Sequence, residues 1–155
     1  MAPAAPGGRA VIELRPLDAS HYDLLSSLQE QEDVWEFIGS LPLPQEDDPH
    51  HLFAVMDDHV GVGVAGLVRT RALDGKDFEL LCAMRADAQS RGLATQACKL
   101  VLAWAFETAQ LDRVISCIDD ANEAARSIAV TLGMQPLRAI PGGRTAYVKY
   151  REERK

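Results

Sequence analysis

The sequence of 155 residues lacks an apolar run long enough to cross a membrane. Its longest apolar segment, residues 60–68, is interrupted by three glycines, whereas a spanning helix needs about 20 consecutive apolar residues. Residues 1–9 contain no apolar stretch and a single arginine, which fits a secretory signal peptide poorly and is typical of a mobile tail. We therefore expect a cytoplasmic protein without a membrane partner.

Cysteine is scarce and dispersed. Cys82, Cys98 and Cys117 form no Cys-x-x-Cys pair, and each lies within an apolar run. The four histidines show no metal-ligand spacing. This pattern argues against a disulfide framework and against a zinc site. It favours buried free thiols in a reducing compartment and predicts no metal.

Positive charge is also limited. Lysine and arginine total 16 against 23 acidic residues, which gives a net charge of −7 and an isoelectric point near 5.0. Nonspecific binding to nucleic acid or to an anionic membrane needs a basic face, so neither is expected, and a cationic substrate is weakly favoured. The hydrophobic fraction of 47% suffices for one core. We predict a tail at 1–9 and a single domain at 10–155.

The apolar periodicity predicts a series of strands and helices. Short β-branched runs indicate strands, and apolar residues three and four apart indicate helices. The predicted strands are 10–14, 52–56, 60–70, 78–84, 113–118, 134–140 and 144–150, and the predicted helices are one after Asp18 through Leu28, then 34–38, 92–110 and 122–132. This order predicts an α+β domain with one mixed, mainly antiparallel sheet and helices on both faces.

One glycine-rich segment imitates a dinucleotide-binding motif. Gly61-Val-Gly63-Val-Ala-Gly66 satisfies the pattern G-x-G-x-x-G. That pattern binds a pyrophosphate only where a strand ends and a helix begins. Residues 67–70 continue the strand and no helix follows, so we interpret these glycines as sites of a bulge or of close packing.

The segment 84–95 is a better candidate for an anion site, because it lies between a strand and the long predicted helix. The backbone N–H groups of a first helical turn and the positive end of the helix dipole bind phosphate. Gly92 allows an unusual dihedral or a close approach, Ala94 is small and Arg91 adds positive charge. An ordinary strand-to-helix turn is the alternative interpretation.

At these residues the sequence resembles the GNAT superfamily of acetyltransferases. Gln89-x-x-Gly92-x-Ala94 is similar to the family signature Gln/Arg-x-x-Gly-x-Gly/Ala. Asn122, followed by a helix that ends in Leu-Gly-Met at 132–134, is similar to a second family element. Residues 34–39 and 78–80 resemble the second helix and the glutamate-bearing fourth strand of the branch that acetylates ribosomal-protein N-termini. The resemblance implies the acyl-CoA N-acyltransferase fold over nearly the whole chain after residue 9.

The resemblance also implies roles for individual residues, with acetyl-CoA as co-substrate. The exposed backbone of Cys82, Ala83 and Met84 would pair with the pantetheine arm where the fourth and fifth strands separate. An N–H group at Met84 or Arg85 would polarise the thioester carbonyl. Asn122 would hydrogen-bond the arm. The pyrophosphate would be held by Gln89, Ser90, Arg91, Gly92, Leu93, Ala94 and Thr95.

Three positions depart from the family pattern. Ala86 stands where the family often has proline. Ala125 stands where the resembling branch has serine, and Ala129 stands where other branches have a tyrosine that protonates the leaving thiolate. No general acid is evident. A thiol with a pKa near 8.5 leaves as thiolate at neutral pH, so such an acid adds rate but is dispensable.

A base is useful, because an amine must lose a proton to attack. Strand alternation places Glu79 on the opposite face from Phe78 and Leu80, and Glu79 is our candidate for the base. The alternative is a carboxylate in an ion pair. Asp119 and Asp120 would either steer a cationic amine or cap the helix that follows Asn122.

The leading hypothesis is an N-acyltransferase that passes acetyl from acetyl-CoA to a primary amine by direct attack in a ternary complex. The alternative is a GNAT-fold module that binds acyl-CoA without efficient catalysis, as a sensor or interaction subunit. A nucleotide-binding domain is a third, less favoured interpretation, based on the glycine segment at 61–66. The acceptor stays open between a protein N-terminus and a small-molecule amine, and the protein is expected to be a monomer or a homodimer.

Overall fold

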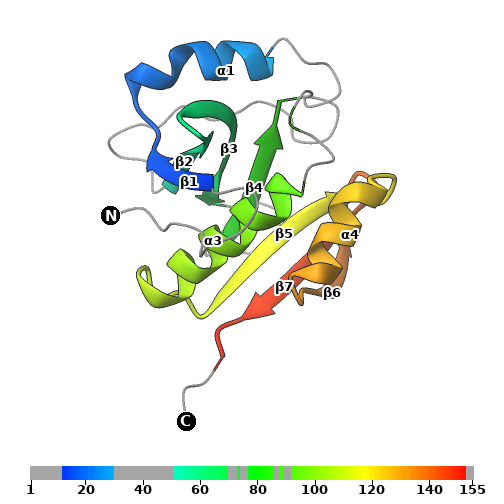
Figure 1. The fold of residues 1–155 in the computed structure, drawn as a ribbon. Helices are drawn as coiled ribbons and strands as arrows, with labels where there is room; N and C mark the ends of the chain where they lie inside the picture. The colour runs from blue at the N-terminus through cyan, green and yellow to red at the C-terminus, as the bar shows by residue number, and fades with distance from the viewer. Residues whose placement is uncertain are drawn as a thin grey trace.

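The computed structural model describes residues 12–29, 51–69, 73, 77–85, 88 and 92–152. Its seven strands form one sheet in the order β1-β2-β3-β4-β5-β7-β6 (Figure 1). All neighbours are antiparallel except β4 and β5, which are parallel. The elements are β1 (Ile12–Pro16), the 3₁₀ helix η1 (Ala19–His21), α1 (Tyr22–Gln29), β2 (His51–Asp57), β3 (Val60–Arg69), β4 (Phe78–Met84), α3 (Leu93–Glu107), β5 (Arg113–Asp119), α4 (Glu123–Thr131), β6 (Gln135–Ile140) and β7 (Arg144–Tyr150). The predicted fold class is confirmed.

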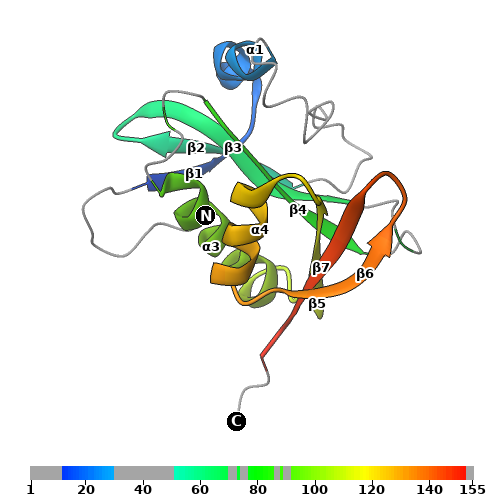
Figure 2. The ribbon, with the colours of Figure 1, turned by 90° about the vertical axis from the view of Figure 1, so that its right-hand side faces the viewer.

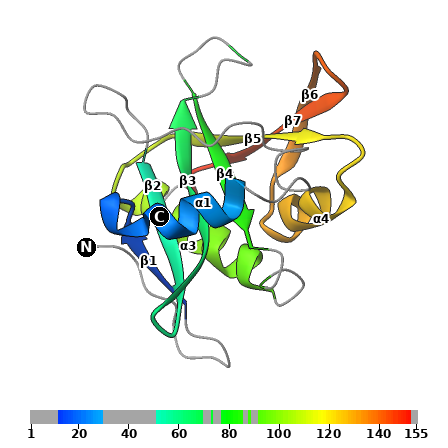
Figure 3. The same ribbon diagram turned by 90° about the horizontal axis from the view of Figure 1, so that it is seen from above.

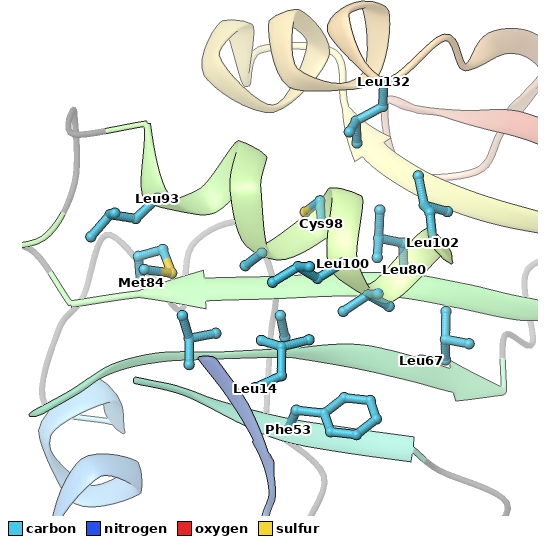
Figure 4. Packing of buried hydrophobic residues seen from close by; sticks show 14 of the residues in the cluster. Leu14, Phe53, Leu67, Leu80, Met84, Leu93, Cys98, Leu100, Leu102 and Leu132 are labelled. Carbon is cyan, nitrogen blue, oxygen red and sulfur yellow. The ribbon is translucent and has the colours of Figure 1, made fainter. Parts of the chain in front are cut away.

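Helices cover both faces of the sheet, as Figure 2 shows. On one face α3 and α4 pack on a large apolar cluster, in which Leu14, Phe53 and Leu67 point from the strands toward α3 (Figure 4). On the other face α1 lies over β2 and β3 (Figure 3), and its Leu24 and Leu28 are buried. The alternation of side chains along β4 is as predicted. Residues 80 and 84 face α3, whereas residues 81 and 83 face α1.

Several predicted element ends differ from the structure by one residue, and the ends of β1 and α3 differ by more. β1 continues through Pro16, which pairs with Phe53; proline is tolerated there because β1 lies at the edge of the sheet, where one side of the strand needs no donor. The long helix α3 ends at Glu107 instead of residue 110. Gln110 has a φ of 56°, and the Leu111 N–H donates to the carbonyl of Ala105. This left-handed helix end usually carries glycine, so glutamine gave no signal for it.

The glycines at 61–66 lie inside strand β3, as predicted. A Cβ atom at Gly66 would come within 2.2 Å of the His51 carbonyl oxygen, and one at Gly63 within 2.5 Å of that of Ala83. At Gly61 the neighbour is Leu24 of α1, at 3.0 Å. The register of β2 against β3 shifts between Val55 and Met56, opposite this segment. Close strand packing, a bulge and helix contact thus account for these glycines.

Several predictions fall on residues outside the described ones. These include the tail at 1–9 and the helix at 34–38. Among the helices of the described ranges, none has the length and apolar character that crossing a membrane requires.

Candidate functional site: a pocket between two parting strands

Strands β4 and β5 form a fork. Their pairing consists of one register pair, Glu79 with Ile115. By contrast, β4 pairs with β3 along the whole of β4, and β5 pairs with β7 along the whole of β5. The arrows of β4 and β5 point the same way but are inclined to each other (Figure 1). The two strands therefore separate toward their carboxyl ends, next to the start of α3.

The backbone amides of β4 alternate between the fork and the neighbouring strand. The Arg85 N–H donates to the carbonyl of Val62 in β3 at 2.8 Å. Because successive amides of a strand point to opposite sides, the N–H of Ala83 also faces β3, whereas those of Cys82 and Met84 face the fork. Two expectations are corrected here. Arg85 does not offer its N–H to a thioester, and Ala83 does not offer its N–H to a pantetheine arm, because both amides belong to the β3 ladder.

The start of α3 has the geometry expected of an anion site. Gly92 precedes the helix with a φ of 73°, in the left-handed region, and nothing lies within 4 Å of the place where a Cβ atom would be. The Gln96 N–H donates to the Gly92 carbonyl. The N–H groups of Leu93, Ala94 and Thr95 therefore belong to the first turn, whose amides lack partners within the helix. The Leu93 side chain is buried beside Met84 and fixes this turn on the core (Figure 4). Gln89, Ser90, Arg91 and Ala86 lie outside the described residues.

A pocket of about 350 Å³ occupies the fork, a size within the range of small-molecule sites. Of the predicted site residues, Glu79, Cys82, Met84, Ala94 and Asn122 line it. Three further lining residues were considered in the sequence, Asp119 as a possible guide for the amine and Ala125 and Ala129 as departures from the family pattern. The lining residues that were not predicted from the sequence are Leu80, Leu81, Cys98, Ser116, Cys117, Ile118, Ile128, Leu132, Met134 and Arg144. For Cys98 a signal existed, since it follows Ala94 by four residues on the same helix.

The pocket reaches through the sheet. Ala94, Cys98 and Ala129 line it from the side of α3 and α4, whereas Glu79 and Leu81 belong to the face that α1 covers. Glu79 is half-buried and lies in the one register pair that joins β4 and β5. A molecule bound between α3 and α4 and a second molecule on the opposite face can therefore meet beside this carboxylate.

Asn122 begins α4 as its N-cap. Its Oδ1 accepts a hydrogen bond from the Ala125 N–H at 3.0 Å. The capping oxygen fixes the carboxamide at the pocket wall and leaves the amide nitrogen as a donor. Within the described residues this nitrogen has no hydrogen-bond partner.

The carboxylates before Asn122 mainly build the turn. Asp119 Oδ1 accepts from the Ala121 N–H at 2.9 Å, and Asp120 Oδ1 accepts from Thr145 Oγ1 at 2.7 Å. The interpretation as helix-turn residues is thus the better supported one, although Asp119 also lines the pocket.

All three cysteines are free and line the pocket. Cys98 is buried, whereas Cys82 and Cys117 are partly exposed. A hydrogen bond with the Cys82 side chain and burial raise the pKa of the Cys98 thiol, so it is protonated at neutral pH. The prediction that the thiols are free is confirmed, but the prediction that they are buried holds only for Cys98, because Cys82 and Cys117 border the pocket. The position of all three around one pocket was not predicted.

The family model described as acetyltransferase (GNAT) domain matches residues 12–135. The chain therefore belongs to the GNAT family of acetyltransferases, and the resemblance noted in its sequence is confirmed. No curated protein sequence matches the chain.

Solved structures with this fold include a spermidine N-acetyltransferase from Vibrio cholerae in complex with CoA and spermine. It is 14% identical over 90% of this chain and 95% of that one, with a TM-score of 0.76. An aminoglycoside acetyltransferase in complex with coenzyme A is 15% identical over 90% and 95%, with a TM-score of 0.76. The ribosomal L7/L12 α-N-protein acetyltransferase RimL, in complex with coenzyme A, is 14% identical over 96% and 98%, with a TM-score of 0.72. At these identities the similarity establishes the fold.

Proposed function

We propose that this protein transfers acetyl from acetyl-CoA to a primary amine by direct attack within a ternary complex. One observation carries the proposal: β4 and β5 part after a single register pair, and the opening faces the first turn of α3. The pyrophosphate would bind the amides of Gly92 to Thr95 together with Gln89, Ser90 and Arg91. The pantetheine arm would lie along β4 and meet Asn122. We expect the protein to act in the cytoplasm.

The chemistry depends on the groups around the pocket. The amine nitrogen forms a bond to the acyl carbon and the carbon–sulfur bond breaks, so that coenzyme A leaves as its thiolate. Glu79 accepts the proton of the amine, directly or through a water molecule. The Met84 N–H, which faces the fork, donates to the carbonyl oxygen as negative charge develops there. An α-amino group, with a pKa of about 7.7–8.0, needs this base less than a lysine amine does.

The acceptor is proposed at the level of a primary amine. The structures with the same fold act on spermidine, an aminoglycoside and a ribosomal protein, and all three acceptors carry amino groups. The alternative, a non-catalytic acyl-CoA-binding module, is favoured by one observation. Ala125 and Ala129 line the pocket, and neither can protonate the leaving thiolate.

The two functions differ in turnover. Binding of coenzyme A is measured by calorimetry, and thiol release from acetyl-CoA is then followed with a peptide, a polyamine, an amino acid and an aminoglycoside. Thiol release that depends on one of these amines supports the transferase. Binding of coenzyme A without thiol release in the presence of any of these amines favours the binding module. A melting temperature that rises with NAD but not with coenzyme A refutes both functions.

The base is tested with Glu79→Gln, and Glu107→Gln, an exposed carboxylate on α3, serves as the matched control. We expect Glu79→Gln to lower kcat by about 10²-fold or more and to remove the acid limb of the pH profile, with the control unchanged. An unaltered rate and pH profile in Glu79→Gln would exclude Glu79 as the base.

A further inference from the structure

An ion pair joins the segments before β4 and at the start of β5, at the end of the fork opposite the pocket, which is the proposed cofactor groove. Arg113 Nε donates to Asp77 Oδ1 and Arg113 Nη2 donates to Asp77 Oδ2, both at 2.8 Å. The Asp77 side chain is 10% exposed and that of Arg113 32%. Asp77 is also the one charged residue of the described ranges that is classed as buried. Two parallel N–H···O bonds from a guanidinium to a carboxylate fix both the distance and the angle between the two groups.

The position of this pair within the sheet gives it a mechanical role. Asp77 precedes Glu79 by two residues, and Arg113 precedes Ile115 by two residues. In parallel strands these offsets place Asp77 opposite Arg113, one pleat before the register pair that joins the strands. The sheet thus consists of two well-paired parts, β1 to β4 and β5 to β7 (Figure 2). Contacts across their junction include the register pair of Glu79 with Ile115 and this ion pair.

We propose that Asp77 and Arg113 are positioning residues that set the opening of the fork and thereby the shape of the cofactor groove. This inference rests on the proposed function. Arg113 is held on its own side by the β5–β7 ladder, where it lies opposite Tyr150. A displacement at the closed end is amplified at the open end, because the strands diverge from this point.

Stability alone does not require charges here. Replacing a buried ion pair by apolar side chains of similar volume is often neutral or stabilising, but it removes the directional bonds. The double variant Asp77→Leu/Arg113→Met therefore separates positioning from stability. Arg113→Lys keeps the positive charge but loses the two parallel hydrogen bonds to the carboxylate. Asp112→Asn breaks the neighbouring pair of Asp112 with Arg151, whose side chains are 90% and 44% exposed, and is the matched control.

The experiment measures the dissociation constant of coenzyme A by calorimetry, the KM for acetyl-CoA and kcat separately, the melting temperature, and amide hydrogen exchange at 80–84 and 116–119. For Asp77→Leu/Arg113→Met we expect a melting temperature near that of the wild type, faster exchange on both arms of the fork and about tenfold weaker binding. We expect KM to rise more than kcat falls. Arg113→Lys should weaken binding about threefold, and Asp112→Asn should leave it unchanged.

Wild-type binding and exchange in the double variant would overturn the positioning role. If the double variant fails to fold, Arg113→Lys decides: unchanged affinity and exchange in that variant also overturn it. If the wild type itself binds no coenzyme A, the proposed function fails. The amide hydrogen exchange rates at 80–84 and 116–119 then still show whether the ion pair fixes β4 and β5 relative to each other.

Discussion

Replacing Gly92 by alanine tests the anion site at the start of α3. Gly92 has a φ of 73°, and a Cβ atom there would meet nothing within 4 Å, so the cost of alanine is conformational and not steric. A left-handed conformation costs an L-residue about 1–2 kcal/mol. If the free protein relaxes out of this conformation, binding must restore it. The affinity for coenzyme A then falls by roughly 5- to 30-fold.

Gly142 supplies the matched control. It also has a positive φ, 91°, and open space at its Cβ position, but it lies in the turn between β6 and β7. Gly142→Ala should lower the free energy of unfolding and leave coenzyme A binding unchanged. Gly92→Ala should weaken coenzyme A binding in calorimetry and lower the free energy of unfolding by less than the full cost of the strain, because the relaxed turn avoids that strain in the free protein. Equal affinity of both variants and the wild type would refute the assignment of this turn to the pyrophosphate.

Three further predictions concern catalysis, pH and stability. Ala129→Tyr brings a phenol to the pocket wall and should raise kcat by roughly tenfold or more if departure of the thiolate is limiting. Ala129→Phe lacks the hydroxyl and should not raise kcat. Equal kcat values of the two variants in steady-state assays would exclude an acid at this position. The pKa of the Cys98 thiol is raised in the folded protein. Its contribution to stability is therefore complete below the pKa of the unfolded chain, near 8.5, and is lost as the pH rises toward the folded pKa. In this range the free energy of unfolding falls by up to about 1.4 kcal/mol per pH unit. Denaturant titrations at pH 7.5 and 9.5 should show this alkaline loss in the wild type and a smaller one in Cys98→Ala, and an identical loss would contradict the assignment. The turn between β2 and β3 places Asp58 and His59 at φ values of 49° and 68°, which strains residues other than glycine and asparagine. Asp58→Asn/His59→Gly should stabilise the protein by about 1 kcal/mol, because asparagine and glycine suit a type I′ turn. A lowered melting temperature of this variant would contradict the assignment of strain to the turn.

Most elements could be predicted because their signals are local. The helix after Asn122 has a side-chain cap at its start and a glycine with a φ of 82° after its end, and both residues are visible in the sequence. The glycines of β3 could be told apart from a dinucleotide motif because residues 67–69 continue the strand instead of beginning a helix. The end of α3 was misplaced, because Gln110 adopts a conformation that normally requires glycine.

The sequence alone determined the family, the strand-to-helix junction at Gly92 and the face of β4 that carries Glu79, since each depends on a motif or a two-residue period. Only the tertiary structure decided which β4 amides face the fork, that three distant thiols share one pocket, and that Asp77 meets Arg113. These features arise where β4 lies beside β5 in parallel. Parallel neighbours are joined by a crossover helix, so the residues that meet are far apart in the chain, and no local pattern encodes their contact.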